Sequence, residues 1–407
     1  MTQHFIGLDL GSHAVKAVVV KQGLRSGEVI RFDAEPTGGD DKGNSTPGDI
    51  VAAAGRLISR INIPDASIFC CVSGEHVSVH RISLPLSAAK RARDVMAFEL
   101  DDRLPYAVED AMFDFVEQKR EADAVVYTVA CVSAERLRSL VEGLQGVGID
   151  PAEITMSPLC YGPYLEEIGA VSAPSAILDL GHNRTNLVIA GDAVTTARTL
   201  LRGGRELTLA LSEEGHVDYA TAQKYKEQAG LSGKVGEVLR DRMNSLCREI
   251  AQTFNGHLAN GGQPVQQLLI CGGGARMPGL DAHLQEVLGI PVSLYRAPVY
   301  RHGVETFDAM LAPELAVLAS CLAGTGLVPK TRRFNLRHGA FAWKGDTEGV
   351  RRRMILLAAC FLGIIGAWIF SSVTHYMAVS AQAEVVRRQL EKETTRVLKE
   401  PVTSRTV

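Results

Sequence analysis

A strand–turn–strand pattern that occurs twice constrains the fold of this chain more than any other feature. The first copy reads HFIGLDLGSHAVKAVVVKQG, and its apolar runs predict strands over Phe5–Leu10 and Val15–Lys21 around a glycine-containing turn. The second copy reads SAILDLGHNRTNLVIAGDAV, and it places Asp179 in the position of Asp9, 170 residues later. One such hairpin is common in α/β proteins, but two copies that open two halves of one chain predict a duplicated domain.

The two turns are candidate phosphate sites. A glycine at each turn, Gly11 and Gly181, lets the backbone approach a ligand closely, and successive N–H groups there can bind an anion. Two such turns predict a nucleotide in the cleft between the halves, with Asp9 and Asp179 holding a hydrated Mg²⁺. The candidate phosphate-contacting residues are Gly11, Ser12, His13, Lys16, Gly181, His182, Asn183 and Thr185.

A glycine-rich stretch, QLLICGGGARMPG, follows near residue 270. A short strand enters Gly272-Gly273-Gly274, and a helix is predicted over about Leu280–Leu288. Bare backbone at a strand end can carry a flat base, whereas by itself the stretch is typical of an ordinary loop. It is not a G-x-G-x-x-G motif, because Met277 occupies the last position, and it lacks the P-loop pattern.

Composition excludes some classes of protein. The chain has 407 residues, of which 46% are hydrophobic, so it is not disordered along its whole length. The net charge of −3 gives no basic surface excess, and we expect no nucleic-acid partner.

The segment Met354–Thr374 has 21 residues and no charge, which is enough to cross a bilayer as a helix. A buried core helix is the alternative, but such a helix is rarely apolar on every side. Lys344 and the run Arg351–Arg353 precede the segment, whereas only Arg387 and Arg388 follow it closely. The positive-inside rule therefore predicts a single-pass protein with residues 1–353 in the cytoplasm and 375–407 outside it.

The order of phosphate hairpin, phosphate hairpin and glycine-rich loop resembles the actin-like ATPase superfamily. This resemblance implies an α/β actin-like ATPase fold, with two related α/β domains around a nucleotide cleft and ATP with Mg²⁺ as ligands. The stretch from Ile82 to Asp114, with its LPL, DRLPY and VED motifs, is similar to the inserted subdomain of PilM-type and FtsA-type proteins.

Two further motifs match PilM-type proteins and imply more nucleotide contacts. Gly203-Gly204, ahead of Leu207-Thr208, matches a "GG..LT" motif after the second hairpin. An "AE..K" motif near the ribose and base is matched by Lys226, but Gln223 stands where the family has glutamate. A neutral amide can still hydrogen-bond a ribose hydroxyl.

The segment NLRHGAFA at Asn335–Ala342, followed by a basic linker and one apolar span, is similar to the GspL family of type II secretion systems. This resemblance implies an inner-membrane scaffold with little or no ATP turnover. Its implied partners are the secretion ATPase GspE, GspM, a second copy of the chain, other platform proteins of the inner membrane, and membrane lipid.

The resemblance also implies the domain limits. We expect a first actin-like half (1–80), an inserted subdomain (81–165), a second half (166–330, with a helical subdomain at 205–262), a basic linker (331–353), the span (354–374) and an outer helix (375–407).

Two alternatives to the secretion scaffold remain open. A type IV pilus alignment protein, with a PilM part fused to the start of PilN, has the same physical properties, and Asn335-Leu336 fits a fused docking motif. A membrane-tethered kinase of the sugar-kinase branch is a third reading, although spacing reveals no general base.

The segment around Asn335 has two possible roles. We expect Phe334 and Leu336 to be apolar anchors against residues 80–165, with Asn335 bonded to backbone and Phe341 as a further contact, because tethering raises the effective concentration of a weak contact. The alternative is a flexible basic linker that meets lipid headgroups.

Overall fold

The computed structural model describes residues 3–23, 27–162, 174–190, 194–297, 313–345 and 347–399. It divides the chain into two compact units, Met1–Trp343 and Lys344–Val407. The expected boundary between residues 165 and 166 and the end of the expected outer helix, 400–407, lie outside the described residues.

The first half of the Met1–Trp343 unit is built on a five-stranded sheet in the order β3-β2-β1-β4-β8. The first three strands form an antiparallel meander, and β4 and β8 continue the sheet in parallel. The strands are β1 (Gln3–Leu10), β2 (Ala14–Gln22), β3 (Gly27–Pro36), β4 (Ser67–Val72) and β8 (Glu153–Met156). The predicted first hairpin is therefore confirmed as β1 and β2.

The second half has a sheet with the same order of strands, β11-β10-β9-β12-β13. Again three strands form an antiparallel meander and two more are parallel. They are β9 (Ser175–Leu180), β10 (Thr185–Ala190), β11 (Val194–Leu200), β12 (Gln267–Cys271) and β13 (Val292–Leu294). This shared topology confirms the duplication that the two hairpins predicted.

A third, smaller sheet has the order β5-β7-β6 and packs against one helix. Its elements are β5 (Ser78–Pro85), α2 (Ala92–Asp101), β6 (Ala111–Arg120) and β7 (Ala124–Ser133). Leu84, Met96 and Leu100 are buried between the sheet and the helix. The range expected for the inserted subdomain also holds α3 (Ala134–Gly146) and β8, and β8 belongs to the first sheet.

Helix α1 (Pro47–Ile61) begins where its sequence supplies a complete N-terminal cap. The Thr46 hydroxyl accepts from the Asp49 N–H, while the Asp49 carboxylate accepts from the Thr46 N–H. Such a capping box satisfies two N–H groups that the first turn leaves unpaired. Its apolar face, with Ala53 and Leu57, is buried in the core of the first half.

The second half carries four helices between β11 and β13, and a further helix begins at Val317. They are α5 (Gly204–Gly215), α6 (Tyr219–Ala229), α7 (Gly233–Ala259), α8 (Leu280–Leu288) and α9 (Val317–Gly324). Helix α8 has the predicted bounds.

Helix α9 is apolar on every side and is buried, as expected for a short helix without a polar face. It packs closely on β1 at Gly7, where a Cβ atom would lie 1.9 Å from the carbonyl oxygen of Ala319. Glycine at this position allows the helix to approach the strand.

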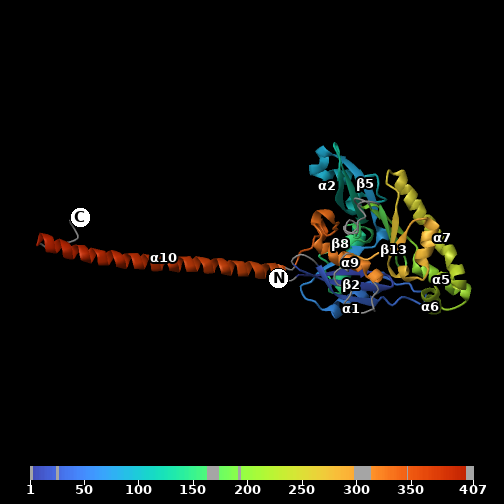
Figure 1. Cartoon of the computed structure of the whole chain (residues 1–407), viewed down its shortest axis with the longest axis horizontal. Helices are drawn as coiled ribbons and strands as arrows, with labels where there is room; N and C mark the ends of the chain where they lie inside the picture. Colours follow the sequence, from blue (N-terminus) through green and yellow to red (C-terminus); the bar gives the residue numbers. More distant parts are fainter. Residues whose placement is uncertain are drawn as a thin grey trace. The chain divides into compact units, whose positions relative to one another are not determined.

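The second unit is dominated by α10 (Thr347–Leu398), a single helix of 52 residues (Figure 1). Among the described residues it is the one helix long and apolar enough to cross a membrane, and none of its apolar window is buried. The predicted span, Met354–Thr374, makes up only part of this helix, which rises about 1.5 Å per residue. The helix begins at Thr347, inside the expected linker 331–353, and continues past the span without a break.

Candidate functional site

A cavity of about 630 Å³ is lined by both predicted phosphate turns. It contains most of the candidate residues from the two halves. These are Asp9, Gly11, Ser12, His13, Lys16, Asp179, Gly181, His182, Gly204, Gln223, Lys226, Gly272, Gly273 and Gly274.

Glycine is sterically required at three points of the cavity wall. A Cβ atom at Gly11 would lie 2.6 Å from the Ala14 carbonyl oxygen, and one at Gly181 would lie 2.9 Å from that of Arg184. Gly272 has a positive φ of 83°, and a Cβ atom there would lie 2.3 Å from Asp179 Oδ1. The turns and the glycine-rich loop therefore present bare backbone to the cavity.

In the first hairpin the carboxylate faces a cation. Lys16 Nζ donates to Asp9 Oδ2 at 2.9 Å, because the two residues are opposite each other in the antiparallel register of β1 and β2. Burial opposes the charged form of Lys16, but the Asp9 carboxylate prevails and raises the pKa of the ammonium group. Lys16, which was predicted to contact phosphate, therefore forms an ion pair with Asp9.

In the second hairpin the equivalent carboxylate has neutral partners. Asp179 Oδ2 accepts from the Tyr161 hydroxyl at 2.7 Å and from Asn186 Nδ2 at 3.4 Å. Burial raises the pKa of Asp179, and the negative charge of Asp9 acts in the same direction. A cation in the cavity would therefore favour the ionised form of Asp179.

The two carboxylates fit a hydrated Mg²⁺ better than a directly ligated metal. Among the described residues, no group of three or more His, Cys, Asp or Glu side chains is arranged to hold a metal ion. The Oδ1 atoms of Asp9 and Asp179 receive no hydrogen bond from any described residue. Mg²⁺ keeps several waters and is commonly bound by one or two carboxylates together with phosphates, which matches these two free oxygens.

The wall formed by α5 and α6 holds a buried ammonium group among neutral oxygens. Lys226 Nζ donates to the Gly204 carbonyl at 2.8 Å, to the Thr208 hydroxyl at 2.7 Å and to Gln223 Oε1 at 2.8 Å. Burial lowers the pKa of Lys226 to about 8. The Gln223 amide nitrogen donates to Glu227, which lines the cavity and places a carboxylate one turn beyond position 223.

Three candidate residues, Asn183, Thr185 and Gly203, are not among those that line the cavity. The Thr185 hydroxyl is fully buried and donates to the Arg202 carbonyl at 2.7 Å. A Cβ atom at Gly203 would lie 2.4 Å from the His182 carbonyl oxygen. The Asn183 Oδ1 atom is buried and receives no hydrogen bond from a described residue. The Thr185 hydroxyl is therefore taken up by a backbone carbonyl, whereas the predicted nucleotide contacts of Asn183 and Gly203 stay predictions.

The sequence argument missed residues that join the cavity walls. Arg184 follows the second turn, and its guanidinium donates to Ser73 of the first half and to Glu75 Oε1 at 2.7 Å. Tyr161, the partner of Asp179, lies outside both hairpins and gives no local signal. Asn186 was recognisable from the duplication, since it occupies the position of Lys16.

The segment after α9 is packed against the first half of the Met1–Trp343 unit. Phe334 and Leu336 are buried in the core of the first half, with 5% and 0% of their surface exposed. The Leu336 N–H donates to the Ile154 carbonyl at 2.7 Å, and the Asn335 side chain accepts from the Ile154 N–H at 3.2 Å. Strand β8 thus has its free edge covered by this segment, the arrangement expected for apolar anchors with Asn335 bonded to backbone.

Charged groups fix the same segment to β8 and to β6. Arg333 forms an ion pair with Glu153 at 2.6 Å, and both side chains are largely buried. The Asn335 N–H donates to Asp114 Oδ2 of β6 at 2.8 Å. Phe341 packs at the edge of the core, with the Arg138 guanidinium 5.8 Å from its ring centre. The segment therefore ties the first sheet to the small third sheet.

Comparison with known proteins gives one family and several similar structures. The model of a family described as type IV pilus assembly protein PilM matches residues 7–299. No curated protein sequence matches the chain. A chain of the PilM–PilN type IV pilus biogenesis complex is 21% identical, with a TM-score of 0.69, over 80% of this chain and 99% of that one.

Two less similar structures are the cytoplasmic domain of EpsL and the protein EutJ. The first is an inner-membrane component of the type II secretion system of Vibrio cholerae, 14% identical, with a TM-score of 0.42 over 83% of this chain and 100% of that one. The second is an ethanolamine utilization protein of Carboxydothermus hydrogenoformans, 13% identical, with a TM-score of 0.46 over 79% and 89%. The PilM likeness, together with the two equivalent sheets, confirms the expected actin-like fold.

Proposed function

The chain belongs to the PilM family of type IV pilus assembly proteins, and from this membership we propose that it is a membrane-linked scaffold of a secretion or pilus assembly machine. We assign it more narrowly to the L component of a type II secretion system. In this role it binds ATP with Mg²⁺ in the cleft and links the secretion ATPase GspE to the inner-membrane platform that includes GspM.

The observation that carries the proposal is the packed segment that ends the first unit. Phe334 and Leu336 fasten this segment to the family domain, and the chain enters the long apolar helix α10 within a few residues. A soluble nucleotide-binding protein has no need of either feature. A chain that carries both in succession can connect a cytoplasmic partner to a membrane platform.

The cavity supports the nucleotide part of the proposal. Asp9 and Asp179 would hold the hydrated Mg²⁺, and the turn residues Ser12 and His182 would meet the phosphates. The metal would supply neutralisation of phosphate charge. We propose that nucleotide acts as a structural or switching ligand with little turnover, because the two acidic groups nearest the turns are held by Lys16 and by Tyr161.

Thermal unfolding of the full chain in detergent tests nucleotide binding. Millimolar ATP with Mg²⁺ should raise the melting temperature, since a ligand bound by the folded state alone stabilises it by RT ln(1 + [L]/Kd). Asp9→Ala and Asp179→Ala should abolish the shift, whereas Arg248→Ala on the exposed face of α7 should keep it. An unchanged melting temperature in the natural chain would overturn the nucleotide assignment.

A second candidate is a type IV pilus protein in which a PilM part and the start of PilN form one chain. The packing of Asn335 and Leu336 on β8 favours it, because a fused docking segment would occupy such an edge. Purification of the full chain from its own membranes separates the two functions. Recovery of GspE-type and GspM-type proteins supports the secretion assignment, and recovery of PilO-type and PilP-type proteins supports the pilus one. Recovery of neither would contradict the scaffold proposal.

We further propose that α10 spans the inner membrane with the first unit in the cytoplasm. A reporter active only in the cytoplasm should work when fused at position 340, and one active only outside should work after position 390. Replacing Arg351, Arg352 and Arg353 by neutral residues should weaken this bias, because these residues carry most of the charge asymmetry. Equal activity of a reporter at both positions would show that α10 does not span.

A further inference from the structure

The connection between β3 and α1 forms a compact loop, residues 37–45, which we call the clasp loop. Asp40 Oδ1 accepts from the Lys42 N–H at 3.0 Å and from the Asn44 N–H at 2.8 Å. The Asp40 N–H in turn donates to the Asn44 carbonyl at 3.0 Å. An aspartate that closes a turn in this way gives the loop a defined shape of its own.

The base of the clasp loop is bonded to the first phosphate turn. The hydroxyl groups of Thr37 and Ser45 both donate to the Ser12 carbonyl, at 2.9 and 2.7 Å. The Thr37 N–H donates to the His13 carbonyl at 3.1 Å. Thr37 is buried, so these bonds hold the loop to the Ser12-His13 turn in a water-poor environment.

The tip of the clasp loop crosses to the second half. Arg205 Nε, at the start of α5, donates to the Lys42 carbonyl at 2.8 Å. His182 Nε2, in the second phosphate turn, donates to the Gly43 carbonyl at 2.7 Å. The Tyr219 ring packs against Gly43, where a Cβ atom would lie 2.5 Å from it. Three separate elements of the second half therefore contact the tip.

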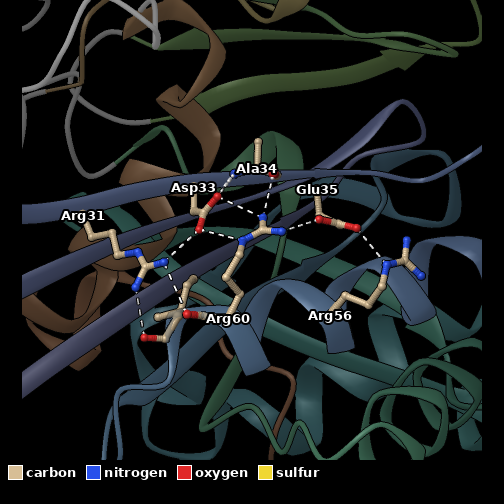
Figure 2. A network of polar contacts seen from close by, with 7 residues as sticks. Arg31, Asp33, Ala34, Glu35, Arg56 and Arg60 are labelled. Carbon is tan, nitrogen blue, oxygen red and sulfur yellow. Dashed lines mark hydrogen bonds and ion pairs between the residues drawn. The ribbon is translucent and has the colours of Figure 1, made fainter.

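The two elements that flank the clasp loop, β3 and α1, form its stems and are held together by ion pairs. Figure 2 shows Arg56 and Arg60 of α1 reaching the acidic side chains of β3. Arg60 pairs with Asp33 at 2.9 Å and with Glu35 at 2.6 Å, and Arg56 pairs with Glu35 at 2.7 Å. Arg56 also donates to the Pro36 carbonyl at 3.3 Å, at the point where the loop begins. With both stems fixed, opening of the loop requires its tip to leave the second half.

We propose that the clasp loop gates nucleotide exchange, with Arg205 and Tyr219 as positioning residues that hold it closed. The gate rests on the proposed nucleotide function of the same cavity. Neither the clasp loop nor Arg205 lines the cavity, so loss of their contact removes no contact to a nucleotide. Breaking them accelerates both steps and leaves the equilibrium affinity unchanged.

Exchange kinetics of a fluorescent ADP analogue on the full chain in detergent test the gate. Arg205 does not line the cavity, and a hydrogen bond from a charged group is worth about tenfold in an equilibrium. Arg205→Ala should therefore raise the association and dissociation rates by about tenfold each, with Kd within twofold of the natural chain. Lys42→Ala is the matched control and should change neither rate, because only the Lys42 carbonyl takes part. A rise in dissociation alone, with a matching rise in Kd, would show that Arg205 binds nucleotide directly and would overturn the gate.

A pair of glycine variants tests the tip without removing a charge. Gly38 and Gly43 both have positive φ, 74° and 68°, so alanine strains the backbone at either position. A Cβ atom at Gly43 would press on the Tyr219 ring, whereas one at Gly38 would meet nothing within 4 Å. Gly43→Ala should therefore accelerate exchange and Gly38→Ala should not. Equal rates in the two variants would contradict the gate.

Hydrogen exchange without nucleotide separates failure of the gate from failure of nucleotide binding. In Arg205→Ala, the amides of residues 40–44 should exchange severalfold faster than in the natural chain. Unchanged exchange would show that the tip contact does not hold the loop, whatever the nucleotide result. Faster hydrogen exchange in a chain that binds no nucleotide would confirm that the tip contact holds the clasp loop. It would contradict both the nucleotide function and the gate that rests on it.

Discussion

The two hairpins have the same strand pairing but differ in the side chains that contact their aspartate carboxylates. In each, the aspartate faces the residue seven positions later in the antiparallel register, which is Lys16 for Asp9 and Asn186 for Asp179. The first pair is an ion pair at 2.9 Å, while the second is a long amide contact supported by the Tyr161 hydroxyl.

This difference shows that the duplicated topology places the two aspartates in equivalent positions, whereas the charge of the residue opposite each of them differs. The ammonium group of Lys16 compensates the charge of Asp9, whereas Asp179 has only neutral hydrogen-bond donors. The cavity therefore has one compensated carboxylate and one whose ionisation is opposed by burial and by Asp9. A cationic ligand would gain most on the side of Asp179.

Removing the cation from the first hairpin should have the largest effect. Lys16→Met should lower the free energy of unfolding by about 3 kcal/mol, because it leaves the buried Asp9 carboxylate without its partner. The matched change Asn186→Leu removes the long contact to Asp179 and the hydrogen bond from the Thr199 hydroxyl, and it should cost less, about 1–2 kcal/mol. Urea unfolding of the two variants measures both values, and equal losses would show that the two hairpins are electrostatically equivalent.

Neutralising the second carboxylate should have a smaller effect of opposite sign. The pKa of Asp179 is raised in the folded state, so folding is penalised once the pH exceeds the unfolded-state value, and the penalty is absent at lower pH. Asp179→Asn should therefore stabilise the ligand-free chain at pH 7 and have little effect near pH 3. Asp9→Asn should destabilise it at pH 7, because Lys16 loses its partner. Stability curves against pH decide this, and a loss of stability in Asp179→Asn at pH 7 would refute it.

The smallest effect is expected at the histidine of the second turn. Burial lowers the pKa of His182 to about 4, so between pH 6.5 and 4 the unfolded chain binds a proton that the folded chain does not. As the pH is lowered through this interval, the free energy of unfolding should decrease. It should decrease less in His182→Asn, which keeps a hydrogen-bond donor toward the Gly43 carbonyl. Melting temperatures at pH 7 and 5 measure the difference. A variant with the same pH dependence as the natural chain would show that His182 does not titrate in this way.

Local patterns allowed the elements around the site to be predicted. Alternating apolar residues and a glycine turn located β1 and β2, and the same pattern found β9 and β10. The bounds of α8 were also predictable, because Gly279 precedes it and Gly289 ends it. The packing of Phe334 and Leu336 was expected from the resemblance of Asn335-Leu336 to a docking motif rather than from a local pattern.

Contacts between distant parts of the chain were not predictable from one sequence. Nothing near Tyr161 indicates that its hydroxyl bonds Asp179, and nothing near Lys42 indicates that its carbonyl meets Arg205. Each contact depends on how distant parts of the chain pack together, and the local pattern of apolar residues does not predict that packing. Asn183 and Thr185 do not line the cavity although their neighbours His182, Arg184 and Asn186 do, and the sequence gives no sign of this difference.

The packed segment on β8 also has a mechanical consequence. Any pull on α10 passes along the chain to Phe341 and then to the bonds between Asn335, Leu336 and Ile154 before it reaches the rest of the first unit. A force on α10 would therefore act on the edge of the first sheet and, through Asp114, on the small third sheet. The cavity between the two turns lies further along this route, so the segment on β8 takes up such a load before the cavity does.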